Sequence, residues 1–226
     1  MKLTVCFIAV LIMFCGSVFS QGVPTDLKKM KIEEIEYTKR LKDNPEIAIE
    51  TNKGTMTFEL YRDVAPAHVD SMLARIHDGF YDSLRIFRLI KGFMLQTGDP
   101  NNNGTGNAGY FLPPEFSDVK HERGTLSMAR GQAPNSASSQ FFICFQRRPS
   151  LDKKYTVFGQ MMTGAQILYD LELTKVKKNP RSQEMAVPIE KLFMKKVTIL
   201  KDKPSKGETE KKADQKTEQK TDESGK

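Results

Sequence analysis

A single cation inside an apolar stretch is the residue of this chain best placed to do chemistry. The stretch Ile86 to Pro100 begins as a strand-like apolar run that Arg88 interrupts, and a second apolar run follows Gly92. A charge in the middle of an apolar strand is costly unless it is paired or faces a wet cleft. Two interpretations of Arg88 stay open at this point: an edge-strand side chain that reaches solvent, or a cation that serves a cleft.

Other residue types that often carry chemistry lack suitable partners in the sequence. Cys144 follows three apolar residues and is interpreted as an inert buried thiol. His68 and His77 have no further ligand set nearby, so we expect no metal site. The glycine- and asparagine-rich loop 101–109 lacks the lysine-serine pair and the following helix of a phosphate-binding loop. We therefore interpret it as a long surface loop.

Short alternating segments and two helical segments are the elements that must position Arg88. A turn at 52–54 separates two alternating strands, and a proline opens the first helix. The expected strands are 46–51, 55–61, 124–130, 138–144 and 155–160, with a mixed apolar run at 187–200. The first expected helix begins near Pro66, and the second spans about 165–173. Short strands at regular spacing with two helices indicate a closed β-barrel.

The length and charge of the chain limit the classes of function. Its 226 residues allow one domain of ordinary size plus tails. The net charge is +7, and basic residues cluster locally between Lys175 and Lys201. A basic face can attract nucleic acid, but the sequence contains no nucleic-acid-binding motif. We interpret the charge as a solvated basic face and expect no nucleic-acid partner.

The N-terminus has the layout of an export signal. Lys2 precedes an apolar run from Leu3 to Phe14, and small or polar residues lead to a plausible cleavage point after Ser20. The run is too short to span a bilayer comfortably, so we expect no membrane span. Cys15 leaves a lipid anchor open as an alternative. Residues 1–20 are therefore predicted to be a secretory signal peptide, and the protein to be periplasmic or secreted.

Three further segments follow the predicted signal peptide. Residues 21–44 form a charged connector with apolar residues at partly helical spacing. Residues 45–200 hold the strand and helix patterns and are predicted to form the folded domain. Residues 201–226 are rich in lysine and acidic residues and contain no aromatic residue. Such a segment cannot bury enough apolar surface to order itself, so we expect a disordered tail.

Four short motifs resemble those of the cyclophilin peptidyl-prolyl isomerases. They occur in consistent order: Phe93-Met94-x-Gln96-x-Gly98-Asp99, Leu126-Ser127-Met128-Ala129, Ser139-Gln140-Phe141-Phe142-Ile143 and Val157-Phe158-Gly159. The resemblance covers about Pro45 to Leu200. It implies a mainly β fold, a closed eight-stranded antiparallel barrel capped by two helices, with the active site on the outer face. It also implies peptidyl-prolyl cis-trans isomerisation without a cofactor.

The same resemblance implies roles for ten residues. Arg88 matches the catalytic arginine of the family. The residues that match the pocket for the proline ring are apolar: Phe93, Met94, Phe142 and Leu151. The positions that match flanking polar groups are Gln96 and Gln140, and those that match the place where substrate backbone is held are Ala129 and Arg130. Tyr155 matches a position that is often tyrosine in bacterial members, so the chain is bacterial-like.

Three positions depart from the pattern of the family. Ser150 stands where many eukaryotic members have a tryptophan that contributes to cyclosporin binding, so we expect weak cyclosporin binding. Phe87 replaces a usual histidine, and Arg130 replaces a usual asparagine. Both changes put catalytic efficiency in doubt without closing the pocket.

The expected activity is prolyl isomerisation that assists the folding of exported proteins. Rotation about a peptide bond breaks no bond, so it needs no nucleophile, only a group that favours the twisted form over the planar one. Arg88 can donate such a hydrogen bond. Two alternatives stay open: a proline-peptide binding module with little turnover, and an adhesive or scaffolding protein. We expect a monomer whose partners are proline-containing peptides and unfolded proteins.

Overall fold

Residues 40–203 are the part of the chain that the computed structural model describes. They form an eight-stranded antiparallel sheet, a two-stranded sheet, two α-helices and one short 3-10 helix. The predicted signal peptide, most of the predicted connector and most of the predicted tail lie outside the described residues.

The first two strands form the hairpin that the alternating pattern predicts. β1 (Glu46–Thr51) pairs antiparallel with β2 (Gly54–Leu60). Gly54 has φ +134°, and a Cβ atom there would lie 2.4 Å from Cδ1 of Ile167. Only glycine fits this turn without strain, because the backbone is in a left-handed region and a neighbouring side chain fills the space.

The eight-stranded sheet has the order β10-β1-β2-β7-β5-β6-β4-β3. Its further strands are β3 (Arg88–Ile90), β4 (Met94–Thr97), β5 (Thr125–Met128), β6 (Phe141–Cys144), β7 (Val157–Thr163) and β10 (Met194–Lys201). The expected strands around β5, β6 and β7 are confirmed, with bounds that differ by a few residues.

The register of the sheet separates a core row from a neighbouring row on the other face. Directly paired residues in the core row are Leu60, Gly159, Leu126, Ile143, Leu95 and Leu89. The five leucine and isoleucine side chains of this row are at most 1% exposed. Paired residues one position along are Ser127, Phe142, Gln96 and Arg88. Because side chains alternate between faces, Arg88, Gln96 and Phe142 share the outer face of the sheet.

Both predicted helices are present in the described part of the chain. α1 (Pro66–His77) starts at a proline, where a missing N–H breaks no helical hydrogen bond. It packs against β10, whereas α2 (Ala165–Glu172) packs against β2. A 3-10 turn, η1 (Pro149–Leu151), follows β6. No helix within residues 40–203 is long and apolar enough to cross a membrane.

The prediction of a closed barrel is wrong, because the sheet is an open half-barrel. Its edge strands are β10 and β3, which form no ladder with each other. An isolated bridge between Arg85 and Phe193 links the segments that precede these two strands. The amide of Ile86 donates to the carbonyl of Leu192 at 3.0 Å on one side of this bridge.

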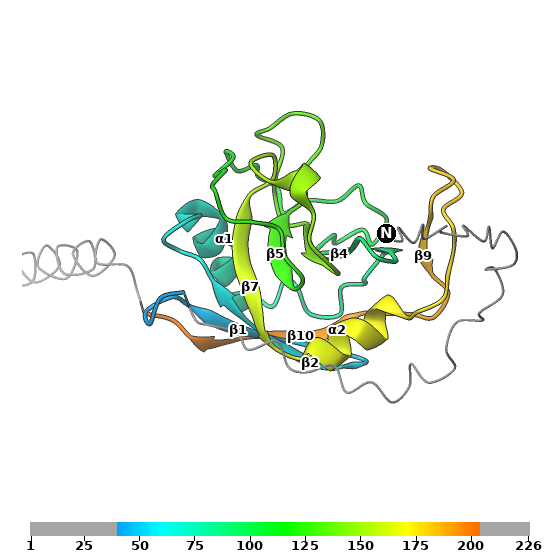
Figure 1. Cartoon of the computed structure of the whole chain (residues 1–226), viewed down its shortest axis with the longest axis horizontal. Coiled ribbons are helices and arrows are strands. Elements are labelled where there is room, and N and C mark those ends of the chain that lie inside the picture. The colour runs from blue at the N-terminus through cyan, green and yellow to red at the C-terminus, as the bar shows by residue number, and fades with distance from the viewer. Residues whose placement is uncertain (1–39, 204–226) are drawn as a thin grey trace, which may run out of the picture. The chain divides into compact units, whose positions relative to one another are not determined.

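A second, two-stranded sheet occupies the place beside the β3 edge. β8 (Val176–Lys178) pairs antiparallel with β9 (Met185–Pro188), and β9 contacts β3. Figure 1 shows β9 in orange, away from the labelled strands β1, β2, β5 and β7. The run 187–200, interpreted from the sequence as one closing segment, is thus divided between β9 and β10. The β8–β9 hairpin covers the edge that a closed barrel would have paired with β10.

Candidate functional site

Nine of the ten predicted site residues line one pocket on the outer face of the sheet. The pocket has a volume of about 180 Å³ and is lined by Arg88, Phe93, Met94, Gln96, Ala129, Arg130, Phe142, Leu151 and Tyr155. Gln140 lies in the adjoining depression, which shares Gln96, Ala129 and Arg130 with the pocket. The structure therefore brings together residues that are up to 67 positions apart along the chain.

The floor of the pocket is a small apolar cluster separate from the core row of the sheet. Met94, Phe142 and Cys144 are its buried members, at 2%, 5% and 0% exposure. Met94 pairs directly with Cys144 across β4 and β6, and the ring of Tyr155 meets Phe142 edge-on at 5.7 Å. The partly buried side chains around them are Ile90, Phe93, Ala129, Leu151 and Tyr155. An apolar hollow of this size suits a small aliphatic ring.

Two chemistries find no support among the described residues. Burial raises the pKa of the Cys144 thiol to about 12, so it stays protonated and inert at neutral pH. Within residues 40–203, no group of three or more histidine, cysteine or acidic side chains could hold a metal ion.

Arg88 stands at the edge of this pocket, with its side chain 32% exposed. Its Nη1 donates to Oε1 of Gln96 at 3.1 Å and lies 3.9 Å from Sδ of Met94. On the opposite edge of the guanidinium, Nε and Nη2 donate to the two carboxylate oxygens of Glu184 at 2.8 and 2.9 Å. Arg88 therefore lies on an edge strand with its side chain partly exposed, and it also borders the cleft, so both interpretations left open by the sequence hold in part.

The hydrogen bond from Arg88 continues through two amide side chains. Nε2 of Gln96 donates to Oε1 of Gln140 at 2.9 Å, and Nε2 of Gln140 donates to the carbonyl of Gly106 at 2.8 Å. Each amide accepts at one end and donates at the other, so the orientation of the three side chains is mutually fixed. Gln140 thus acts on the pocket through Gln96, from the adjoining depression.

Asp99 organises the glycine- and asparagine-rich loop that supplies the Gly106 carbonyl. Its carboxylate is fully buried and accepts hydrogen bonds from four backbone amides: Asn101, Asn103, Gly104 and Gly106. A Cβ atom at Gly106 would lie 2.1 Å from Oδ1 of Asp99, so glycine is required there. The amides that a phosphate would need are bound to a carboxylate of the chain itself.

Arg130 and Phe87, the two residues that differ from the family pattern near the catalytic position, lie in different places relative to the pocket. The Arg130 guanidinium lies 4.7 Å from the centre of the Tyr155 ring and donates to the carbonyl of Lys154 at 2.9 and 3.2 Å. Its charge is therefore directed along the rim of the pocket. Phe87 is absent from the lining of the pocket and packs near Gly104 of the Asp99 loop.

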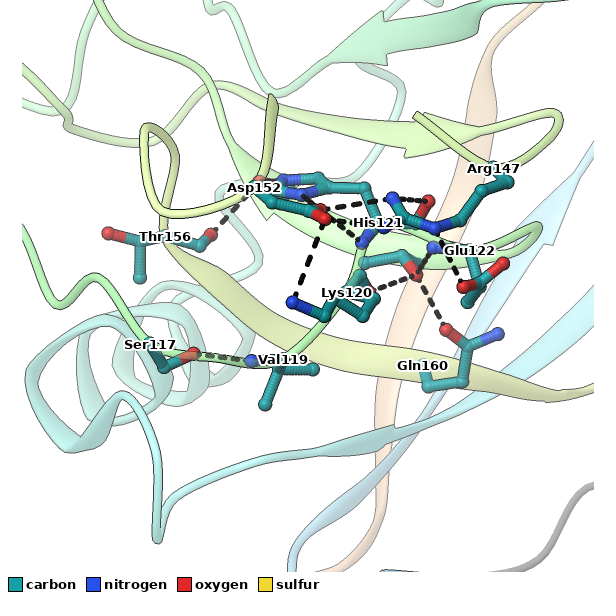
Figure 2. A network of polar contacts seen from close by, with 11 residues as sticks. Ser117, Val119, Lys120, His121, Glu122, Arg147, Asp152, Thr156 and Gln160 are labelled. Atoms are coloured by element: carbon teal, nitrogen blue, oxygen red, sulfur yellow. Dashed lines mark hydrogen bonds and ion pairs between the residues drawn. The ribbon is translucent and has the colours of Figure 1, made fainter. Parts of the chain in front are cut away.

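A polar network surrounds His121 and Asp152 (Figure 2). The imidazole of His121 is fully buried and lies parallel to the Phe142 ring, with 6.1 Å between the ring centroids and 9° between the ring planes. Asp152 Oδ1 lies 3.1 Å from Nδ1 of His121, and Asp152 also pairs with Arg147. Burial lowers the pKa of His121, and the hydrogen bond from Arg147 lowers the pKa of Asp152. At neutral pH the network therefore holds a neutral imidazole against an ionised carboxylate.

Ser127, His121 and Asp152 are arranged like the members of a hydrolytic triad. Oγ of Ser127 lies 3.0 Å from Nε2 of His121. However, Ser127 and His121 are both 0% exposed, so no substrate reaches the hydroxyl. The arrangement is structural: it holds the back of the pocket in place.

Sequence reasoning missed two residues that bear on the pocket. None of the four motifs includes His121, although Nε2 of its ring lies 3.0 Å from Oγ of Ser127, six positions further along the chain. Glu184 lies 96 positions from Arg88 and follows no recognisable motif, so no sequence signal pointed to it.

Comparison with known proteins gives a consistent result. Residues 46–194 match the profile of the family described as cyclophilin type peptidyl-prolyl cis-trans isomerase/CLD. A peptidyl-prolyl cis-trans isomerase of Synechococcus elongatus is 46% identical over 112 residues, which cover 50% of this chain and 77% of that protein. The peptidyl-prolyl cis-trans isomerase-like 3 of Gallus gallus is 37% identical over 158 residues, covering 68% of this chain and 94% of that protein.

The fold is similar to that of a solved isomerase. A cyclophilin type peptidyl-prolyl cis-trans isomerase of Cryptosporidium parvum, crystallised in the presence of the dipeptide Ala-Pro, superposes with a TM-score of 0.63 and 31% sequence identity. The superposition covers 70% of this chain and 99% of that one.

Proposed function

Because the chain belongs to the cyclophilin-type family of peptidyl-prolyl cis-trans isomerases, we propose that the pocket beside Arg88 is the site at which it isomerises prolyl peptide bonds. The activity is that of the family. We propose in addition which residues carry out this activity, which substrates they act on and in which compartment the protein works.

The reaction demands differential stabilisation of a twisted amide. Amide resonance opposes rotation about the peptide bond with a barrier of about 18–20 kcal/mol. In the twisted state the nitrogen loses that resonance and becomes able to accept a hydrogen bond. A donor that meets the twisted form better than the planar form accelerates rotation, whereas equal binding of both forms does not. Each tenfold in rate requires about 1.4 kcal/mol of such preference.

One observation carries the proposal: a permanently charged guanidinium at the edge of an apolar pocket. Met94 and Phe142 offer the proline ring a buried floor, and Phe93, Leu151 and Tyr155 flank it. The two N–H groups of Nη1 in Arg88 are directed at Oε1 of Gln96 and at Sδ of Met94, and the thioether is a weak acceptor that a substrate can replace. Such a group can donate to the imide as it twists, and its charge strengthens the hydrogen bond.

Proline-containing peptides are the proposed substrates. The presence of Ala-Pro with the related Cryptosporidium parvum isomerase supports this choice. The test is turnover: the natural chain should accelerate cis-trans exchange of an Ala-Pro peptide, followed by exchange NMR. Saturable binding of the peptide without faster exchange would favour the alternative of a proline-peptide binding module.

We also propose that the isomerase is exported and assists the folding of exported proteins. The proposal is supported by the sequence pattern of residues 1–20, which lie outside the described part of the structure. Mass determination of the mature protein tests it. A mass that matches a chain starting at Gln21 is expected, and a lipidated chain starting at Cys15 would support the anchored alternative. A full-length chain would contradict export.

Weak binding of cyclosporin remains part of the proposal. Ser150 is exposed on η1, beside Leu151 of the pocket, and offers neither the surface nor the N–H of an indole. Ser150→Trp should therefore strengthen cyclosporin inhibition with little change in peptide turnover. A nanomolar Kd for the natural chain, measured by titration calorimetry, would contradict this expectation. The proposal retains a monomer that does not bind nucleic acid.

A further inference from the structure

The carboxylate of Glu184 accepts two hydrogen bonds from one edge of the Arg88 guanidinium. Oε2 accepts from Nε at 2.8 Å and Oε1 from Nη2 at 2.9 Å, so the two groups form a bidentate pair. Two parallel hydrogen bonds between planar groups fix the plane of the guanidinium and its rotation within that plane. The hydrogen bond from Arg88 lowers the pKa of Glu184, so the carboxylate stays ionised at neutral pH.

The pair leaves the other edge of the guanidinium directed at the pocket. Nη1 lies beside Oε1 of Gln96 and Sδ of Met94, both of which line the pocket. Glu184 is absent from the pocket lining. It therefore binds the edge away from the pocket and does not occupy the position that a substrate would take.

The position of Glu184 is set by the hairpin that carries it. Glu184 immediately precedes β9, which contacts β3, the strand that begins at Arg88. The amide of Asn179 donates to the carbonyl of Glu184 at 2.7 Å, and the amide of Gln183 donates to the carbonyl of Asn179 at 2.9 Å. The turn is thus closed by backbone bonds at Glu184 itself, which holds its side chain beside Arg88.

The pair contributes little to the stability of the fold. The side chains of Arg88 and Glu184 are 32% and 35% exposed, and ion pairs that water reaches in this way add little to the free energy of unfolding. The pair instead orients the Arg88 side chain, which has several freely rotating bonds when Glu184 does not hold it. Without Glu184, the described contacts that hold the guanidinium are those to Gln96 and Met94.

We propose that Glu184 is a positioning residue for isomerisation: it holds Arg88 with its Nη1 edge toward the bound prolyl bond. The inference rests on the proposed function and extends it to the β8–β9 hairpin. Because the arginine contact matters most when the amide is twisted, loss of orientation should lower kcat and leave KM nearly unchanged.

The first test compares Glu184→Ala and Glu184→Gln with a matched control. Glu184→Ala should lower kcat for an Ala-Pro peptide about tenfold and change KM by less than about twofold. Glu184→Gln keeps the shape and one acceptor, so it should lose less. Glu190→Ala is the control: it removes another exposed glutamate, which lies two residues after β9 and pairs with Lys53 at 2.7 Å. This variant should leave kcat unchanged.

A double-mutant cycle separates positioning from a general effect on the hairpin. In an Arg88→Ala background, Glu184→Ala should have no further effect on kcat, because the group that it orients is gone. An equal loss in both backgrounds would overturn the proposal, as would unchanged or raised kcat in Glu184→Ala beside an active natural chain. Those results would leave the proposed function intact, whereas absence of turnover in the natural chain would overturn both.

Discussion

Arg88→Ala is expected to lower kcat/KM for an Ala-Pro peptide at least about 100-fold, which corresponds to roughly 2.7 kcal/mol of transition-state stabilisation. The reason is that alanine removes the guanidinium whose Nη1 lies beside Gln96 and Met94 at the edge of the pocket. Arg130, which also lines the pocket, lies over the ring of Tyr155 and donates to the carbonyl of Lys154. The fold should persist, since Arg88 is partly exposed at the start of an edge strand of three residues. Exchange NMR at several enzyme concentrations measures the effect.

A matched arginine provides the control for this experiment. Arg75 on α1 is 31% exposed, close to the 32% of Arg88, and pairs with Asp78 at 2.7 Å. Arg75→Ala should therefore leave kcat/KM unchanged within about twofold. Equal turnover by the Arg88→Ala variant and the natural chain, with circular dichroism spectra alike, would reject Arg88 as the catalytic residue.

Asp152→Ala is expected to lower the free energy of unfolding by about 2 to 3 kcal/mol, through loss of charged hydrogen bonds in the network behind Phe142. Asp152 is 13% exposed and accepts from the backbone amide of His121 at 3.0 Å, from its ring and from Arg147. Alanine leaves the buried imidazole without its acceptor. The thermal midpoint should fall by about 4 to 12 °C.

The control for Asp152 is another aspartate that forms an ion pair nearby in the sequence. Asp118 pairs with Lys153 at 2.6 Å, but its side chain is 84% exposed. Asp118→Ala should therefore shift the thermal midpoint far less. Thermal unfolding followed by circular dichroism measures both variants. Equal midpoints for Asp152→Ala and Asp118→Ala would show that the network around Asp152 does not contribute to the free energy of unfolding.

Local pattern was sufficient to predict the elements that hold the pocket. The alternation in β1 and β2 and the proline at the start of α1 report on neighbouring residues, so the sequence predicts them directly. The motif residues Met94, Gln96 and Phe142 fall on one face because β4 and β6 pair in register. The resemblance to a family supplied their grouping, which periodicity alone could not.

The errors in prediction arise from long-range packing. Closure of the barrel depends on whether β3 meets β10, and the β8–β9 hairpin lies beside β3 instead. β8 has the sequence Val-Lys-Lys and β9 the sequence Met-Ala-Val-Pro, so both strands are too short to show a clear alternation in the sequence, and neither is predicted as a separate strand. The contact between Glu184 and Arg88 follows from the same hairpin and was missed for the same reason.

The most direct test of the central claim is to locate a bound proline peptide on the protein. An Ala-Pro peptide should shift the backbone amide signals of Met94, Phe142 and Tyr155 and the side-chain Nε–H signal of Arg88 in ¹H–¹⁵N spectra, in the same sample in which its cis-trans exchange is accelerated. Shifts centred on the exposed apolar residues Leu173 and Ile189, which line a different depression, would contradict the assignment of the pocket beside Arg88.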